Sequence, residues 1–253
     1  MIVDIHAHIG HHPLMDFKQT TEEVIAVMEK YGIDVSFVMP FPSMKNQAVN
    51  DAIAEAVKEY PGRLIGFANI DPGADDASEE IDRIVALGLK GVMLDPEFHR
   101  VIGRDAPNPK VEELMVPCMD HGLPVLFNTP NIETGDHASF IVGGISEPYY
   151  RSLDQLAFKF PEVRLLVNTH WPRIRELMKE HSNIFVDTGG RNGVGSGVRI
   201  AQDAAPTRVC FGSESPQNHP GLGIKNVRTI KVPQVYKDLV LGRNAERIFK
   251  DLL

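Results

Sequence analysis

The chain has 253 residues, of which 43% are hydrophobic and 24% charged, and its net charge is −8 at pH 7. These proportions are those of a globular protein and exclude a disordered, collagen-like or coiled-coil chain. The negative charge disfavours nucleic acid or an acidic membrane surface as a partner, because phosphate groups attract basic surfaces.

The two cysteines, Cys118 and Cys210, are too few for a disulfide framework or a cysteine-based zinc site. The N-terminal sequence MIVDIHAHIG lacks the basic and cleavable apolar segments of a signal peptide. No stretch approaches the roughly 18 apolar residues of a membrane-spanning helix. We therefore expect a cytoplasmic protein with a small-molecule substrate and no membrane partner.

Short apolar runs rich in β-branched residues recur along the chain. Near-continuous apolar runs are typical of parallel strands that are covered on both faces. The expected strands are Ile2–Ile5, Val35–Met39, Leu64–Ile70, Leu89–Leu94, Pro124–Phe127, Arg164–Val167, Asn183–Val186 and Arg208–Phe211.

Longer segments with helical periodicity separate these runs. Thr20 and Glu23 form a capping box at the start of the first helix, and Gly32 ends it. Pro117 should kink the fourth helix. The other helices are expected at Gln47–Tyr60, Ser78–Leu87, Val111–His121, Leu153–Phe160, Arg173–Glu180, Val198–Ala204, Gln234–Val240 and Asn244–Leu252.

Eight strands that alternate with helices in a chain of this length predict a (β/α)8 TIM barrel, with residues 1–253 as one domain. A doubly wound open sheet is the alternative, but its glycine fingerprint is missing after the first strand. In such barrels the active site lies at the carboxyl ends of the strands.

Two histidines end the first predicted strand. His6 and His8 are two positions apart, so their imidazoles should lie on one face of the strand and point into the barrel mouth. Neutral imidazoles are common ligands of zinc, iron and manganese. His11 and His12 follow in the loop, where solvated side chains are expected.

Two further polar residues end later strands. His170 follows the sixth strand, and Glu214 follows the eighth strand, which closes the barrel beside the first. A glutamate at an apolar strand end needs a partner, because burial of its charge is costly. A metal at His6 and His8 would be such a partner.

With these residues in place, the chain resembles the amidohydrolase superfamily. The likeness is to its amidohydrolase-related branch of metal-dependent TIM-barrel hydrolases and aromatic-acid decarboxylases, and it runs over nearly the whole sequence. It is carried by Asp4-Ile5-His6-Ala7-His8, by Pro161-x-x-Arg164-Leu165-Leu166 with His170, by Phe211-Gly212-Ser213-Glu214-Ser215-Pro216, and by the tail Leu241–Phe249.

The sequence departs from the family pattern at two positions. Asn128 stands after the fifth strand, where a histidine ligand is common, and Glu214 stands where aspartate is common. The resemblance then implies His6, His8 and Glu214 as metal ligands, with water completing the shell. The expected cofactor is a divalent metal, with zinc as the first choice, manganese or iron as alternatives, and a metal-free site as the remaining alternative.

The resemblance also implies catalytic and substrate-binding roles. Glu214 would take a proton from water, while His170 and Asn128 would steady the developing oxyanion. Residues in the loops at the mouth would bind the substrate, including those of the long Thr129–Arg151 loop, whose aromatic side chains also suggest a homodimer. The expected substrate-binding residues are Asp95, Arg151, Trp171 and Arg191.

Together these expectations describe a metal-dependent hydrolase that uses metal-activated water on a small carboxylate-bearing amide, lactone or ester. The alternative within the superfamily is a lyase, either a metal-dependent decarboxylase or a hydratase. A metal-dependent DNase is disfavoured by the net charge and by Asn128. A degenerate barrel without catalytic activity also remains open.

Overall fold

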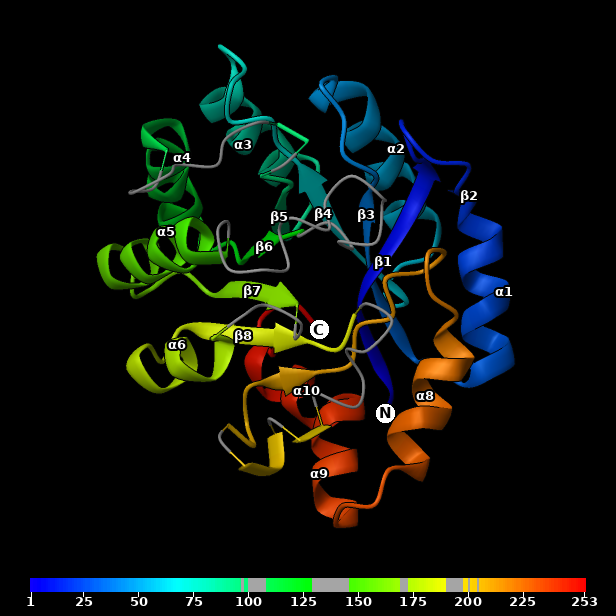
Figure 1. Ribbon diagram of the computed structural model, residues 1–253. Helices are drawn as coiled ribbons and strands as arrows, with labels where there is room; N and C mark the ends of the chain where they lie inside the picture. Colours follow the sequence, from blue (N-terminus) through cyan, green and yellow to red (C-terminus); the bar gives the residue numbers. More distant parts are fainter. Residues whose placement is uncertain are drawn as a thin grey trace.

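The computed structural model describes residues 1–96, 98–99, 108–128, 146–168, 173–189, 198–199, 201–203 and 205–253. Parallel strands form its centre and helices surround them, as in the expected (β/α)8 TIM barrel (Figure 1). The short strand β2 (Lys18–Gln19) pairs antiparallel with the end of β1. The eight parallel strands are β1 (Val3–His11), β3 (Val35–Pro40), β4 (Leu64–Asn69), β5 (Gly91–Leu94), β6 (Val125–Phe127), β7 (Leu165–Asn168), β8 (Ile184–Asp187) and β9 (Val209–Cys210).

Backbone hydrogen bonds join β1 to the chain that follows β9. The nitrogen of Ile5 donates to the oxygen of Phe211 over 2.9 Å, and the nitrogen of His8 donates to the oxygen of Ser215 over 2.7 Å. A parallel bridge pairs Ala7 with Ser215. The first and last strands are therefore neighbours, as the barrel prediction requires.

Helices follow most of the strands at nearly the expected positions. The capping box of Thr20 and Glu23 is present at the start of α1 (Thr21–Tyr31), and α4 (Pro109–Asp120) runs through Pro117 without interruption. The other helices are α2 (Asn46–Glu59), α3 (Ala77–Ala86), α5 (Ser146–Lys159), α6 (Ile174–Glu180), α8 (Pro220–Thr229), α9 (Gln234–Asp238), the π-helix η2 (Leu239–Arg243) and α10 (Asn244–Ile248). No helix in the described ranges is long and apolar enough to span a bilayer.

The sequence analysis missed one helix and made one loop too long. Helix α8 had no predicted counterpart, because Gly221 and Gly223 weaken the helical pattern in its first turn. The predicted Thr129–Arg151 loop is shorter, since α5 already begins at Ser146. Tyr150, expected to be exposed in that loop, is buried against α6, where its hydroxyl donates to Glu180.

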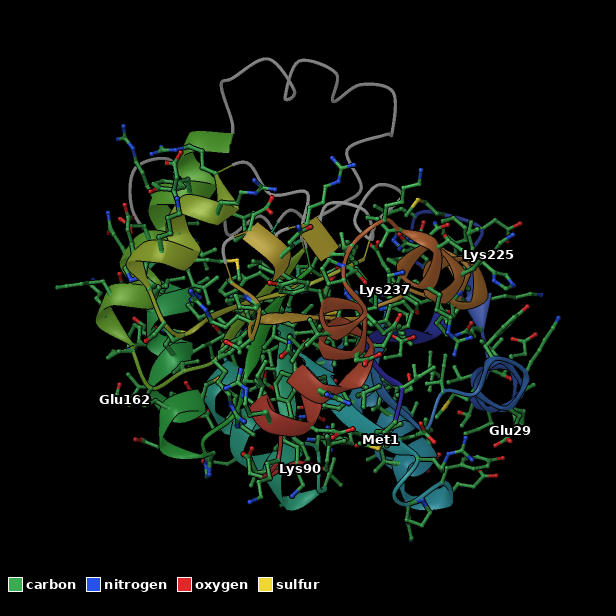
Figure 2. The ribbon with its side chains drawn as sticks, turned by 90° about the horizontal axis from the view of Figure 1, so that it is seen from below. Met1, Glu29, Lys90, Glu162, Lys225 and Lys237 are labelled. Carbon is green, nitrogen blue, oxygen red and sulfur yellow. The ribbon has the colours of Figure 1, made fainter. Side chains whose placement is uncertain are left out.

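Side chains of the strands alternate between two apolar cores. Inward-facing residues such as Phe37, Phe67 and Leu126 fill the barrel, whereas their neighbours pack against the helices. Phe249, which follows α10, closes the amino-terminal end of the barrel, and its ring lies 5.0 Å from that of Phe37. In the side view, Met1, Lys90 and Glu162, which precede strands β1, β5 and β7, lie toward this same end (Figure 2). The opposite, carboxyl end is the mouth of the barrel.

A bulge in β1 turns the two histidines inward. The pairing with β3 shifts by one residue between Asp4 and Ala7. Before the shift, Val3 and Ile5 belong to the inner core, and after it Ala7 and Ile9 belong to the outer core. The extra residue reverses the alternation, so His6 and His8 take the inward positions.

The barrel interior leaves no room for a side chain at Gly91. A β-carbon built there would lie 2.5 Å from the ring of Phe67. We expect Gly91→Ala to lower the free energy of unfolding by about 1–3 kcal/mol, because the phenyl ring has to leave its place. Urea denaturation measures this loss. The loss should be smaller in a Phe67→Leu background, and an equal loss there would contradict the steric explanation.

Candidate active site at the barrel mouth

His6 and His8 face each other at the centre of the mouth. Both side chains are buried, and their Nε2 atoms lie 3.1 Å apart. The ring of His8 stacks on Phe41 at a centroid distance of 4.7 Å. The spacing of two residues and the bulge in β1 thus bring two imidazoles to one point.

The second ring nitrogen of each histidine has a fixed acceptor. His6 Nδ1 lies 3.0 Å from Asp187 Oδ2, and His8 Nδ1 lies 3.1 Å from the carbonyl oxygen of Pro40. These acceptors hold the proton on Nδ1, so both Nε2 atoms present lone pairs to each other. Histidines that ligate metals show this arrangement of a carboxylate or carbonyl behind the ring.

This pair fits a divalent metal ion. Zinc–nitrogen bonds of about 2.0–2.1 Å place two ligand nitrogens about 2.9–3.3 Å apart at bond angles near 90–110°. The two Nε2 atoms are 3.1 Å apart. Without a cation, two neutral imidazoles in these tautomers would oppose lone pair to lone pair.

Charge and burial shift the pKa values of the two rings in opposite directions. Burial lowers the pKa of His8 well below its usual value, and nearby His6 acts in the same direction. Burial also opposes protonation of His6, but the carboxylates around it, Asp187 foremost, outweigh this effect and raise its pKa. The carboxylates around His6 therefore favour positive charge at this point of the mouth.

Glu214 lies directly beside this pair. Its backbone nitrogen donates to the oxygen of His6 over 2.7 Å, and its carboxylate accepts a hydrogen bond from Asn218 over 3.1 Å. The residue is buried and adopts a left-handed backbone conformation with φ of 58°. Gly212 allows the close approach, since a β-carbon there would lie 2.9 Å from that of Asp187 and 3.0 Å from that of His6.

Asp95 and Asn128 form a second polar pair at the mouth. Asn128 Nδ2 donates to Asp95 Oδ2 over 2.9 Å, and both residues are buried. They follow β5 and β6, two positions beyond the inward residues Met93 and Leu126. The structure therefore groups the predicted residues into His6, His8 and Glu214 on one side, and Asp95 with Asn128 after strands β5 and β6.

Three of the remaining predicted residues, His170, Trp171 and Arg191, fall outside the part of the chain that the structure describes. Arg151 is exposed on α5. His11 is exposed as expected, but His12 is buried, and its Nδ1 accepts hydrogen bonds from the backbone nitrogens of Leu14 and Met15.

Sequence reasoning gave no role to Asp187 or Asp4. Asp187 ends β8, and this position after an apolar strand was the available signal. Asp4 Oδ1 accepts hydrogen bonds from the backbone nitrogens of Ser213 and His6. Asp4 thus ties β1 to the segment that carries Glu214.

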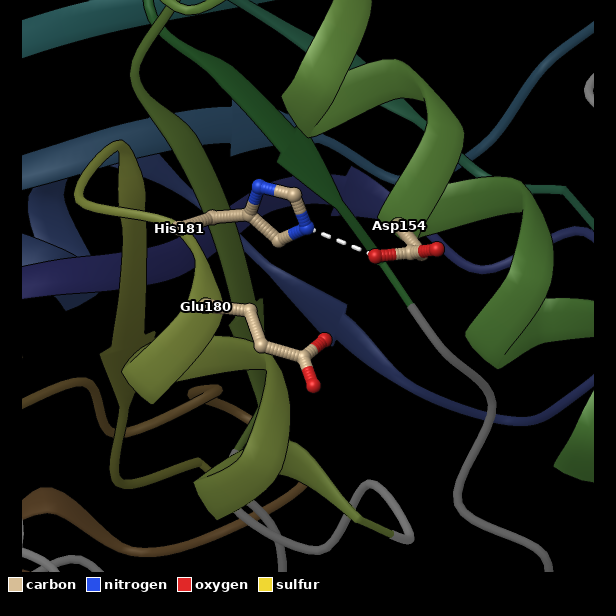
Figure 3. A group of neighbouring side chains, drawn as sticks. All are labelled: Asp154, Glu180 and His181. Atoms are coloured by element: carbon tan, nitrogen blue, oxygen red, sulfur yellow. Dashed lines mark hydrogen bonds and ion pairs between the residues drawn. The ribbon is translucent and has the colours of Figure 1, made fainter.

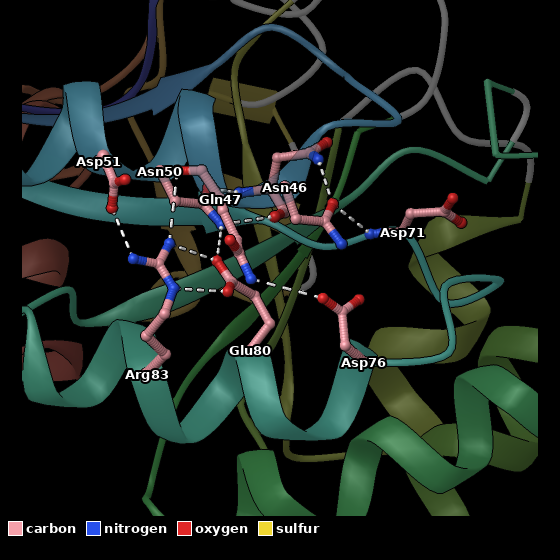
Figure 4. A network of polar contacts seen from close by, with 9 residues as sticks. Asn46, Gln47, Asn50, Asp51, Asp71, Asp76, Glu80 and Arg83 are labelled. Carbon is pink, nitrogen blue, oxygen red and sulfur yellow. Dashed lines mark hydrogen bonds and ion pairs between the residues drawn. The ribbon is translucent and has the colours of Figure 1, made fainter.

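A buried polar network supports the mouth after β4 (Figure 4). Asn46 Oδ1 accepts from the backbone nitrogen of Asp71 over 2.9 Å and from Asn69 Nδ2 over 3.0 Å. Asn50 donates to Glu80 over 2.8 Å and so connects α2 with α3. The network fixes the turn that places Asp71 at the mouth.

A separate group of possible metal ligands lies on the outer helices. Asp154, Glu180 and His181 come from α5, from α6 and from the residue that follows α6 (Figure 3). Asp154 Oδ1 is 2.6 Å from His181 Nε2, and Tyr150 donates to Glu180. Hydrogen bonds between protein groups thus account for this cluster, which lies before β8, away from the carboxyl ends of the strands.

Comparisons with known proteins identify the family and the fold of this chain. The family model of amidohydrolases matches residues 3–250. No curated protein matches the sequence. Among solved structures, 5-carboxyvanillate decarboxylase LigW from Sphingomonas paucimobilis superposes with a TM-score of 0.76 at 15% identity, covering 98% of both chains.

Two further structures have the same fold. Dihydroxybenzoic acid decarboxylase from Polaromonas sp. JS666, with bound manganese and 2-nitroresorcinol, gives a TM-score of 0.73 at 14% identity over 98% of this chain and 96% of that one. A probable 2-pyrone-4,6-dicarboxylic acid hydrolase from Acinetobacter baumannii, with citric acid bound, gives 0.70 at 15% identity over 98% and 99%. Two decarboxylases and a probable hydrolase are therefore similar to this chain in fold.

The carboxylate behind His6 should control metal affinity. Asp187→Asn keeps the shape but removes the charge that holds His6 in place, so we expect divalent metal to bind about 10–100-fold more weakly. Competition with a chromophoric chelator measures the dissociation constant. Asp154→Asn makes the same change in the outer cluster and should leave the affinity unchanged. If Asp154→Asn weakened metal binding and Asp187→Asn did not, the metal would be assigned to the outer cluster.

Asp4 should make stability depend on pH. Burial raises its pKa from 3.8 to about 6, so the folded state binds its proton more tightly than the unfolded state does. The stability from this group is present below pH 3.8 and is lost as the pH rises through 6. In chelator-treated protein, Asp4→Asn should therefore gain on the order of 2 kcal/mol relative to wild type between pH 4.5 and 7.5. Equal urea midpoint differences at the two pH values would contradict this.

Proposed function

Because the chain belongs to the amidohydrolase family, we propose that it is a metal-dependent lyase that decarboxylates a small aromatic carboxylic acid. The observation that carries the proposal is the buried pair of His6 and His8, whose Nε2 atoms converge at 3.1 Å. The decarboxylases among the similar structures favour the lyase over the hydrolase first expected from the sequence.

His6 and His8, together with Glu214, would hold the divalent metal, which when bound supplies positive charge to neutralise the substrate carboxylate. Asp187 and Pro40 keep the two rings in the tautomer that this needs. Zinc or manganese meets the donor set of two imidazoles and a carboxylate. We propose further that the protein is a homodimer in the cytoplasm.

Decarboxylation breaks the bond between the ring carbon and its carboxylate and leaves an electron pair on that carbon. One proton has to reach the carbon as carbon dioxide leaves. Glu214 is buried beside the pair and is held by Asn218, so its carboxylate could take a proton from water and pass it to that carbon. His170 is the other proposed donor, and Asp95, Trp171, Arg151 and Arg191 are the proposed substrate contacts.

Hydrolysis of a lactone is the second candidate. The similar fold of a probable pyrone dicarboxylic acid hydrolase favours it. In that reaction Glu214 would accept a proton from the attacking water, and Asn128 would donate to the developing oxyanion. Lyase and hydrolase differ in the product, because only the lyase releases carbon dioxide.

We expect the manganese- or zinc-loaded protein to release carbon dioxide from at least one hydroxylated benzoate or 5-carboxyvanillate, and not to open 2-pyrone-4,6-dicarboxylate. His8→Ala should abolish both turnover and metal binding, because it removes one of the converging nitrogens. His121→Ala, which changes a histidine paired with Asp82 on the outer surface, is the matched control. Ring opening of the pyrone without release of carbon dioxide would favour the hydrolase, and full activity of His8→Ala would overturn the metal site.

A further inference from the structure

The side-chain oxygen of Asn128 is buried and has no hydrogen-bond partner. An unsatisfied buried acceptor is destabilising, so native proteins rarely keep one without a reason. The other amide atom is satisfied, since Nδ2 donates to Asp95 Oδ2 over 2.9 Å. Only the acceptor of Asn128 therefore lacks a partner.

Asp95 determines which way the amide points. Asp95 Oδ2 accepts this hydrogen bond, so the amide nitrogen of Asn128, which is its donor, faces Asp95. Asp95 is itself held, because its Oδ1 accepts from the backbone nitrogen of Phe98 over 2.8 Å. The backbone of Asn128 is fixed as well, through a hydrogen bond of 2.8 Å to Leu94. These hydrogen bonds thus direct the amide oxygen of Asn128 away from Asp95.

Strand alternation directs Asn128 into the mouth. Leu126, two residues earlier, lies in the inner core, and successive side chains of a strand point to opposite faces. Phe185 and Asp187 have the same relation in β8, where Asp187 supports His6. Asn128 and the histidine pair therefore face the same interior space.

A second unpartnered acceptor lies on this side of the mouth. His99 is buried, and its Nε2 lies 3.1 Å from the carbonyl oxygen of Ser43, which can only accept. Nδ1 therefore carries the lone pair, and it has no partner. His99 is joined to Asp95 by a backbone hydrogen bond of 3.0 Å. Both unpartnered atoms near Asp95 would be satisfied by a hydrogen-bond donor.

We propose that Asn128 Oδ1 is a specificity-determining acceptor for a hydroxyl group on the substrate, so that the enzyme selects hydroxylated aromatic acids over their ethers. The inference rests on the proposed function, because it assumes an aromatic carboxylate at the histidine pair. A hydroxyl donates the hydrogen bond that Oδ1 lacks. A methoxy group cannot donate a hydrogen bond and would leave the buried oxygen unsatisfied.

The test measures binding of matched probes to the manganese-loaded protein by calorimetry. The probes are 2-, 3- and 4-hydroxybenzoate, and each is compared with its methoxybenzoate. For at least one ring position, we expect the wild type to bind the hydroxy acid about tenfold or more tightly than the methoxy acid. Asn128→Leu, which keeps the volume but removes the acceptor, should reduce this ratio to about twofold or less.

Two further variants sharpen the result. Ser36→Ala removes another buried, unpartnered oxygen, which lies between the inward residues Val35 and Phe37 and so faces away from the barrel interior. It should keep the wild-type ratio. Asp95→Asn should lower the ratio although it leaves Asn128 in place, because an amide at position 95 can donate and lets the Asn128 amide turn over.

The outcomes separate the two proposals. If no benzoate binds the wild type, the aromatic-acid function fails and the inference fails with it. If hydroxy and methoxy acids bind the wild type equally, or Asn128→Leu keeps the ratio, the inference alone is overturned. Loss of stoichiometric manganese from Asn128→Leu would make Asn128 a metal ligand, which also overturns it.

Discussion

Main-chain hydrogen bonds between β1 and the segment after β9 hold the mouth of this barrel together. They join His6 to Glu214 and His8 to Ser215, residues that lie more than 200 positions apart in the sequence. Because the bonds use backbone atoms, the relative place of the histidines and the glutamate does not depend on their own side chains. The closure of the barrel is therefore also the assembly of the site.

The polar groups of the closed mouth are buried, and hydrogen bonds orient them. Pro40 and Asp187, from strands on either side of β1 and β9, each accept from one of the two histidines. In a low-dielectric interior such bonds are strong, and an unpaired polar atom is costly. The supporting groups therefore determine which nitrogens are free to bind a ligand.

The unsatisfied atoms are informative for the same reason. Among the described residues, five buried side-chain atoms lack a partner, and two of them, on Asn128 and His99, lie around Asp95 near the mouth. Both are acceptors, so a hydrogen-bond donor would satisfy them. With the metal proposed at the histidine pair, they fit the proposed substrate, which carries a carboxylate and a hydroxyl group.

Local patterns in the sequence were sufficient for the barrel, for the capping box of Thr20 and Glu23, and for the shared face of His6 and His8, since each depends on residues close in sequence. They did not predict α8, where two glycines weaken the helical pattern, and they did not predict that Tyr150 is buried. Only the tertiary structure decided the bulge in β1, the support of His6 by Asp187, and the direction of the Asn128 amide. Each of these depends on contacts between strands that no local periodicity encodes, because a hydrogen-bond partner is chosen by where the chain returns in space.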